Sequence, residues 1–245
     1  MASQPIYQFY AQLKDYEPKI WRRFQVAGNV TLARLGYIVM TMYEMKASHL
    51  FCIDYSLKNE WEQEIPCDKK EKVIPFPTQT NRIERFEVPS EDPLLEFEDV
   101  RTHDATQMTL RRFTSEPGTI LTMQYDYGDG WEVELRLEDV IMDEALPGKL
   151  LPRVLEGEGY GIIEDCGGPG GLEELTKAFQ EKAGPEYQRF SEWLGCEELD
   201  TSAFDLEDMN FRLKKVPRIY RDIYEYGYLP TMQSMSLLKR DYPKK

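Results

Sequence analysis

Alternating apolar and polar residues predict a β-hairpin between residues 120 and 140. Each arm places an apolar residue at every second position, which is the period of a strand with one buried face. The apolar positions are Leu121, Met123, Tyr125 and Tyr127 on the near arm and Trp131, Val133, Leu135 and Leu137 on the far arm. Gly128-Asp129-Gly130 lies between the arms, and Gly130 supplies the left-handed residue on which a three-residue loop ends.

The same apolar positions predict the register of the two arms. A two-residue turn would set apolar residues opposite charged ones, because a shift by one residue moves every side chain to the other face. A three-residue loop over residues 128–130 instead pairs Tyr127 with Trp131 and Tyr125 with Val133. Because such apolar cross-strand pairs stabilise a hairpin, we expect this register.

Asp126 and Glu132 face each other on the polar side of a hairpin with this register. Two like charges separated by about 5 Å repel by roughly 1 kcal/mol in water and roughly 3 kcal/mol at an effective dielectric of 20. We therefore expect a cation or a basic side chain beside this acid pair.

Outside the hairpin, the pattern predicts further short strands and several helices. Period-two alternation predicts strands over residues 6–13, 20–26 and 49–55. Apolar residues at helical spacing predict helices that include residues 31–45, 172–182, 190–194, 206–213 and part of the tail beyond 216. The charged, Pro-rich segment 58–104 predicts loops and short strands, and residues 104–113 predict a short helix or extended piece.

These elements predict a single α+β domain. We expect a mostly antiparallel sheet, centred on the 120–140 hairpin and covered by helices near 31–45 and 170–194. Residues 1–215 form this domain in our interpretation, and residues 216–245 form a basic, Tyr-rich C-terminal helix and tail.

The charge of the chain bears on the class of partner. The 245 residues carry a net charge of −14, and residues 214–245 have a net charge of +5, which leaves −19 for residues 1–213. An acidic body opposes binding to nucleic acid and to anionic membranes, because both require basic side chains at the phosphates. A DNA-binding accessory role would therefore depend on the tail and on Arg22 and Arg23.

The cysteines and the hydropathy indicate the compartment. The four cysteines show no Cys-x-x-Cys spacing and are too few to staple a chain of this size, so we expect reduced thiols. No signal peptide opens the sequence, and no apolar run approaches the length of a membrane span. We expect a cytoplasmic protein without membrane contact.

Five sequence strings in order resemble the plasmid pRiA4b open-reading-frame-three-like family, whose members are often borne on plasmids or other mobile elements. The strings are Pro18-Lys19-Ile20-Trp21-Arg22-Arg23, Ser48-His49-Leu50-Phe51, Tyr125-Asp126-Tyr127-Gly128-Asp129-Gly130-Trp131-Glu132, residues 155–159 with 164–169, and Phe204-Asp205-Leu206 with Asn210 and Leu213. The resemblance implies an α+β fold and implies no settled activity.

The chain departs from the family pattern at three places. Val133 stands where relatives usually carry His, and Ile162-Ile163 replaces the usual Pro-Pro. Glu186-Tyr187-Gln188-Arg189 replaces a His-rich stretch. If those histidines bind metal in relatives, this chain lacks that ability.

The acidic residues of the hairpin and of the later turn are candidates for a metal site. They are Asp126, Asp129, Glu132, Glu164 and Asp165. Carboxylate oxygens suit Mg, Mn or Ca, and a hydrolase or nuclease could use such an ion. The competing interpretation is an acidic face that is solvated or paired with arginine, and it requires no cofactor. We favour it because the sequence has no ligand loop of fixed spacing.

Three further features around the glycine turn permit chemistry but have structural interpretations. Cys166 precedes a helix start, where a thiolate nucleophile is possible, but a small residue in a tight turn explains it equally. His49 lies among apolar strand residues, which favours a packed, hydrogen-bonded histidine over a base or a ligand. Residues 167–171 could present amides to an anion, but Glu164 and Asp165 oppose phosphate there and could cap the helix instead.

Trp21, Arg22 and Arg23 resemble a nucleic-acid contact in isolation. Arg22 shares a face with apolar residues, so we expect its charge to pair with a carboxylate of the hairpin or of the glycine turn.

The sequence thus predicts a non-catalytic binding or regulatory module. We expect the acidic surface and an edge formed by Tyr127 and Trp131 to contact an unknown protein partner, with the basic tail docked on the body or on that partner. The metal-dependent hydrolase and the DNA-binding accessory protein are the alternatives.

Overall fold

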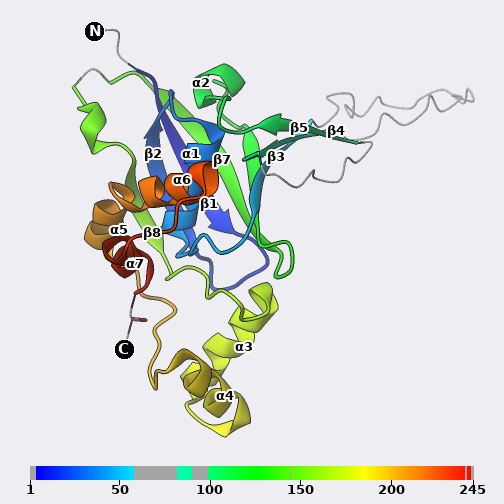
Figure 1. Ribbon diagram of the computed structural model, residues 1–245, viewed down its shortest axis with the longest axis vertical. Helices are drawn as coiled ribbons and strands as arrows, with labels where there is room; N and C mark the ends of the chain where they lie inside the picture. Colours follow the sequence, from blue (N-terminus) through cyan, green and yellow to red (C-terminus); the bar gives the residue numbers. More distant parts are fainter. Residues whose placement is uncertain (1–3, 58–81, 90–98, 144, 241, 244–245) are drawn as a thin grey trace, which may run out of the picture.

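The computed structural model describes residues 4–57, 82–89, 99–143, 145–240 and 242–243. Eight strands form one sheet in the order β5-β4-β3-β6-β7-β1-β2-β8 (Figure 1). Their bounds are β1 Ile6–Leu13, β2 Trp21–Ala27, β3 Phe51–Leu57, β4 Arg82–Glu87, β5 Val100–Asp104, β6 Ile120–Tyr125, β7 Trp131–Ile141 and β8 Arg153–Glu158. Among these strands only β4 and β5 pair in parallel, so the α+β prediction with a mostly antiparallel sheet is confirmed.

The helices lie on one face and at both ends of the sheet (Figure 1). They are α1 Leu32–Met42, α2 Leu110–Phe113, α3 Gly168–Glu181, α4 Gly184–Leu194, α5 Leu206–Leu213, α6 Val216–Tyr226 and α7 Met232–Leu238, with a 3-10 turn at Gly148–Leu150. In the described part of the chain, none of these helices has the length and apolar character needed to cross a membrane. Segments 58–81 and 90–98 of the predicted loop-rich region lie outside the described residues.

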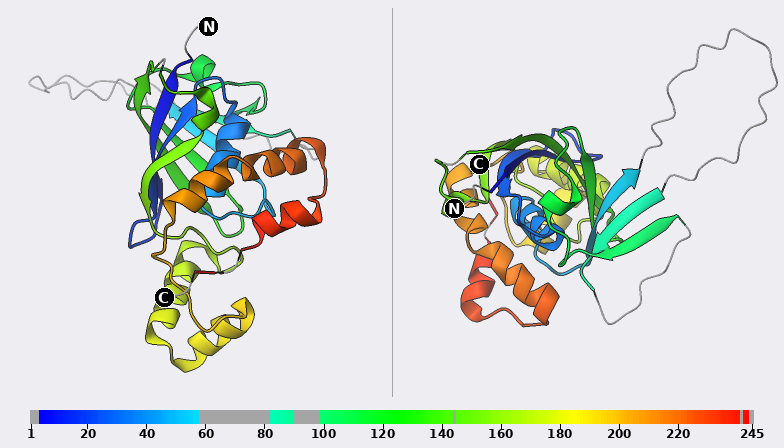
Figure 2. Two further views of the ribbon diagram at one scale, coloured as in Figure 1. Left: turned by 90° about the vertical axis from the view of Figure 1, so that its left-hand side faces the viewer. Right: turned by 90° about the horizontal axis from the view of Figure 1, so that it is seen from above.

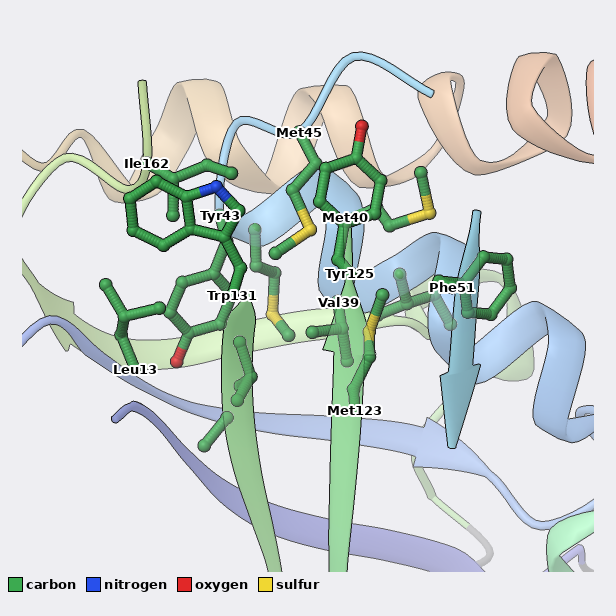
Figure 3. Packing of buried hydrophobic residues seen from close by; sticks show 14 of the residues in the cluster. Leu13, Val39, Met40, Tyr43, Met45, Phe51, Met123, Tyr125, Trp131 and Ile162 are labelled. Carbon is green, nitrogen blue, oxygen red and sulfur yellow. The ribbon is translucent and has the colours of Figure 1, made fainter. Parts of the chain in front are cut away.

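Helix α1 forms the centre of the core. The hydroxyl of Thr31 caps it by accepting a hydrogen bond from the amide of Arg34 (3.1 Å). Nearly every residue of the helix is buried, because the sheet curves around one side and α5 and α6 pack on the other (Figure 2). Trp131 and Tyr125, at the ends of neighbouring strands, join Val39 of α1 and Tyr43, the residue that follows it, in this core (Figure 3).

The hairpin exists, but its register differs from the prediction. Tyr125 pairs with Trp131 and Met123 pairs with Val133, so the arms are shifted by two residues and the loop has five residues, 126–130. Apolar residues still pair with apolar residues, as the alternation required. Tyr127, however, leaves the strand and lies in the loop.

The backbone of Asp126 explains the longer loop. Asp126 has a left-handed φ of 54°, and its carboxylate accepts a hydrogen bond from the amide of Gly128 (3.0 Å). Its carbonyl accepts from the amide of Gly130 (2.7 Å), which has the predicted left-handed conformation. The expected Asp126–Glu132 pair is therefore wrong, since Glu132 pairs with Gln124 and its carboxylate binds Lys14 (2.5 Å).

Helices α3 and α4 do not cover the sheet as predicted. They lie beyond the end of the sheet at which the hairpin turns (Figure 1), and the cover over the face comes from α1, α5 and α6.

The C-terminal tail docks on the body of the protein, which is one of the two arrangements predicted for it. Arg240 reaches the buried carboxylate of Glu44 (2.9 Å) and the carboxylate of Asp208 (2.7 Å).

Candidate functional site

Three loops meet where the hairpin turns, and each contributes one side chain that can bind a metal ion. His49 precedes β3, Asp126 follows β6 and Asp165 precedes α3. The Nε2 atom of His49 lies 3.4 Å from Oδ2 of Asp126 and 3.6 Å from Oδ1 of Asp165. One ligand atom of each residue lies within 4.8 Å of the other two, and we call this group the His–Asp–Asp cluster.

Strand pairing brings His49 and Asp126 together. Phe51 of β3 pairs with Tyr125 of β6, so the residues just outside these strand ends are neighbours. The amide of Asp126 donates to the carbonyl of Leu50 (3.0 Å), which extends the ladder by one bond. Since β3 begins at Phe51 rather than at the predicted residue 49, His49 is free to lie in a loop.

The glycine turn before α3 brings Asp165 to the same place. Gly168 has a left-handed φ of 71°, and a Cβ on it would lie 2.2 Å from the carbonyl oxygen of Asp129. The amide of Gly167 points at the carboxylate of Asp129 (3.4 Å). The hairpin loop and the glycine turn therefore pack directly against each other, and glycine at 168 makes the contact possible.

His49 is held from two sides. The edge of its ring contacts Tyr125, with ring centroids 5.7 Å apart and an interplanar angle of 89°. Its carbonyl accepts a hydrogen bond from the hydroxyl of Tyr224 on α6. The ring is partly exposed, so its Nε2 faces both the two carboxylates and solvent.

Glu164 supports the site and lies outside the cluster. It is buried, and its carboxylate accepts hydrogen bonds from the amide of Lys46 (2.6 Å), the hydroxyl of Ser48 (2.6 Å) and the hydroxyl of Tyr125. Burial raises the pKa of the Tyr125 phenol, and the adjacent Glu164 carboxylate raises it further. Glu164 thus links the loop that carries His49 to the hairpin, whereas we had expected it to cap α3.

Of the five acids considered from the sequence, the structure brings Asp126 and Asp165 into one cluster. Asp129 contacts the glycine turn, and Glu132 binds Lys14. From the sequence pattern, a packed and hydrogen-bonded role is expected for His49 rather than a ligand role. The signal that could have found it is the order of strands, because β3 beside β6 places the residues before 51 next to those after 125. Val133, where the family pattern has His, is fully buried and outside the cluster.

Cys166 has the environment of a structural residue. Burial raises the pKa of its thiol to about 12, and the nearby carboxylate of Asp129 adds to the rise. Its sulfur lies 3.6 Å from the carbonyl oxygen of Gly168. A thiol with this pKa carries almost no thiolate at neutral pH, which supports the small-residue interpretation over the nucleophile.

The prediction that Arg22 pairs with a carboxylate is wrong, because its guanidinium binds backbone carbonyl oxygens. The side chain is fully buried on β2, and its guanidinium donates to backbone carbonyl oxygens of residues 21, 158, 159 and 160. Burial lowers the pKa of this guanidinium to about 10. Four carbonyl dipoles and the flanking rings of Tyr43 and Phe204 take the place of a counter-ion.

The other predicted contact residues are also engaged within the molecule. Arg23 forms ion pairs with Glu138 (2.7 Å) and Glu156. These carboxylates neutralise its charge and so oppose a contact with DNA phosphates. The indole of Trp21 donates to Glu158 (3.2 Å). Trp131 is fully buried and cannot form a contact edge, whereas Tyr127 is half exposed.

Comparisons with known proteins place the chain among relatives of unknown function. The family model described as plasmid pRiA4b ORF-3-like protein matches residues 5–211. The uncharacterized protein y4hQ of Sinorhizobium fredii is 33% identical over 86 residues, which cover 35% of this chain and 43% of that protein. The chain thus matches less than half the length of this curated relative.

A solved structure shares the fold. A protein of unknown function from Methanosarcina mazei Go1 superposes with a TM-score of 0.62 at 22% identity, over 84% of this chain and 98% of that protein. This likeness concerns the fold alone. The family match, in contrast, extends over most of the chain and includes all three residues of the His–Asp–Asp cluster. The chain belongs to the plasmid pRiA4b ORF-3-like family.

Proposed function

We propose that this protein is a metal-dependent binding module that holds a divalent ion at His49, Asp126 and Asp165. The spacing of the cluster carries the proposal. The distances of 3.4 and 3.6 Å between Nε2 and the two carboxylate oxygens are long for hydrogen bonds. They are close to the separation of roughly 3.0–3.5 Å between adjacent ligand atoms that surround a metal ion with bonds of about 2.1 Å.

The electrostatics of the site favour a cation. Among the described residues, neither Asp126 nor Asp165 forms an ion pair with lysine or arginine, and the basic side chain that each contacts is His49. Asp129 lies against the same turn and adds a third negative charge. A divalent ion would offset this concentration of carboxylates.

The imidazole determines which ions fit best. Calcium and magnesium prefer oxygen ligands, and the acids alone suggested Mg, Mn or Ca. A nitrogen ligand together with two carboxylates suits Mn, Fe, Co or Zn better. We therefore expect the affinity for Mn, Co and Zn to exceed that for Mg and Ca.

Three protein ligands leave coordination positions open. Asp165 is largely exposed, so these positions face solvent at the end of the sheet. An anionic group of a partner, such as a carboxylate or a phosphate, could complete the coordination. The acidic body by itself has no surface that suits an anionic partner. The bound ion would supply the positive charge at the centre of such a contact surface.

The open positions also favour a second candidate function. Catalytic metal sites bind the ion through three protein ligands and keep a position for water, which the ion activates as a nucleophile. The second candidate is thus a metal-dependent phosphoester hydrolase, as the acidic residues suggested. Turnover of a phosphodiester such as bis(p-nitrophenyl) phosphate by the ion-loaded protein would distinguish it from the binding module.

The test of metal binding uses the chelator-treated full chain with Mn, Co, Zn, Mg and Ca. An ion at a hundredfold excess over its dissociation constant stabilises the fold by about 2.7 kcal/mol, which thermal unfolding detects. The Asp126→Asn variant should lose this stabilisation. Glu132→Gln is the matched control, because Glu132 lies on the same hairpin but pairs with Lys14. The absence of any shift, or an equal effect of both substitutions, would contradict the proposal.

A further inference from the structure

Helix α6 contacts the loop that carries His49. The hydroxyl of Tyr220 donates to the carbonyl of Met45, and the hydroxyl of Tyr224 donates to the carbonyl of His49. The two tyrosines are four residues apart, so they project from the same face of the helix. This helix follows the segment matched by the family model, which ends at residue 211.

The environment of both tyrosines fixes the hydroxyl groups as donors. Tyr220 is fully buried, and Tyr224 stacks on Tyr37 with ring centroids 5.7 Å apart. The edge of Phe51 contacts Tyr224 from another side, at 5.3 Å between centroids. Each partner is a backbone carbonyl oxygen, which can only accept, so both hydroxyl groups donate. Rings packed in this way keep each hydroxyl oxygen beside its carbonyl acceptor.

The loop between α1 and β3 needs such support. Glu44 and Ala47 both have left-handed φ angles, 59° and 62°, which are unfavourable for residues with a side chain. Glu164 holds one side of the loop through the amide of Lys46 and the hydroxyl of Ser48. The two tyrosines hold the same loop through the carbonyls of Met45 and His49. The position of the His49 backbone therefore depends on α6.

We infer that Tyr224 is a positioning residue for the metal ligand His49, and that α6 belongs to the support of the cation site. This inference rests on the proposed metal-binding function. Groups that orient a metal-binding histidine commonly change the metal affinity by 10–100-fold when they are removed. Here the bond reaches the backbone of the ligand residue and not its ring, so we expect a loss near the lower end of this range.

The experiment compares two substitutions that each remove one hydroxyl from the interface of α1 and α6. Tyr224→Phe removes the bond to His49. Tyr37→Phe is the matched control, because its hydroxyl donates to Glu225 across the same interface (3.2 Å) and does not reach the loop. Titration with cobalt, followed by its visible absorption, should show about tenfold weaker binding for Tyr224→Phe and unchanged binding for Tyr37→Phe. Equal affinity of Tyr224→Phe and the native protein would overturn the inference.

A second measurement keeps the inference separate from metal binding. The chain has two histidines, so the ring signals of His49 in a metal-free NMR spectrum are identified by comparison with a His103 variant. Tyr224→Phe should shift or broaden the His49 signals and leave those of His103 unchanged. If the native protein binds no ion, the proposed function fails while this spectrum still decides the positioning role. If Tyr224→Phe does not fold, Tyr220→Phe takes its place, with a several-fold loss of affinity and a smaller spectral change expected, and unchanged values overturning the inference.

Discussion

The guanidinium carbon of Arg22 lies 4.1 Å from the centroid of the Phe204 ring. The positively charged side chain is fully buried, and the face of this ring covers it. Together with the carbonyl oxygens on β8 and the turn after it, this contact connects β2 to the segment that leads into α5. The acceptors are backbone carbonyl oxygens, so the side chains at 158 and 160 do not supply them.

Arg22→Met should therefore destabilise the protein by about 3 kcal/mol, because it leaves buried carbonyl oxygens without donors. Urea unfolding measures the loss. Arg23→Met, at the adjacent residue, should lose less than about 1 kcal/mol, since its ion pairs are partly exposed. Equal losses for the two variants would show that the carbonyl bonds of Arg22 contribute little.

Alternation alone was sufficient to predict β1, β2 and the buried face of the hairpin, and it did not indicate β8. The strand at Ile6–Leu13 has the predicted bounds, and Trp131 and Val133 are buried as the period of two requires. The five-residue loop could not be predicted in this way. It depends on the bond from the amide of Asp126 to the carbonyl of Leu50, which directly precedes a strand whose place in the sheet the local pattern does not specify.

The sequence predicted only part of the candidate site, because the local pattern does not specify which strands and loops become neighbours. Acids at 126 and 165 were visible as candidates, but their meeting with His49 depends on β3 lying beside β6 and on the hairpin loop packing on the glycine turn. The partners of Arg22 escaped prediction because backbone carbonyls have no signature in the sequence.

Glu44 carries a second buried charge, and its partners predict the effect of neutralising it. Arg212 binds both of its carboxylate oxygens (2.5 and 2.6 Å) and is itself buried. Glu44→Gln should cost about 3–5 kcal/mol in urea unfolding, because the guanidinium of Arg212 loses its counter-ion in the interior. Asp208→Asn, which affects only the partly exposed Arg240, should cost less than about 1 kcal/mol. A loss for Glu44→Gln no larger than this control would contradict the argument.

Gly168 and Gly170 predict opposite effects of the same substitution. Alanine at 168 would clash with the carbonyl of Asp129 in a left-handed backbone, whereas nothing lies within 4 Å of a Cβ at 170. Gly168→Ala should lower the free energy of unfolding by at least about 2 kcal/mol and weaken ion binding by separating the two loops. Gly170→Ala, inside α3, should be neutral or stabilising by about 0.5–1 kcal/mol. Thermal unfolding of both variants, with and without ion, provides the check.

Cys166 predicts a distinct pH dependence of alkylation. Since its thiol has a pKa of about 12, the thiolate fraction rises tenfold with each pH unit up to that value. At pH 8 iodoacetamide should modify Cys166 roughly a thousandfold more slowly than a free cysteine whose pKa is about 8.5. Mass spectrometry of the peptide that contains Cys166 follows the rate. A rate that levels off near pH 8 or 9 would instead indicate an activated thiol.

The three residues of the His–Asp–Asp cluster come from segments that are far apart in the chain and that become neighbours only through strand pairing and loop packing. A half-formed molecule, with β3 paired to β6 but α3 still undocked, would offer two ligands in place of three. The visible spectrum of cobalt responds to the number and geometry of its ligands, so rapid mixing of refolding protein with cobalt would record the moment at which the last of these segments arrives.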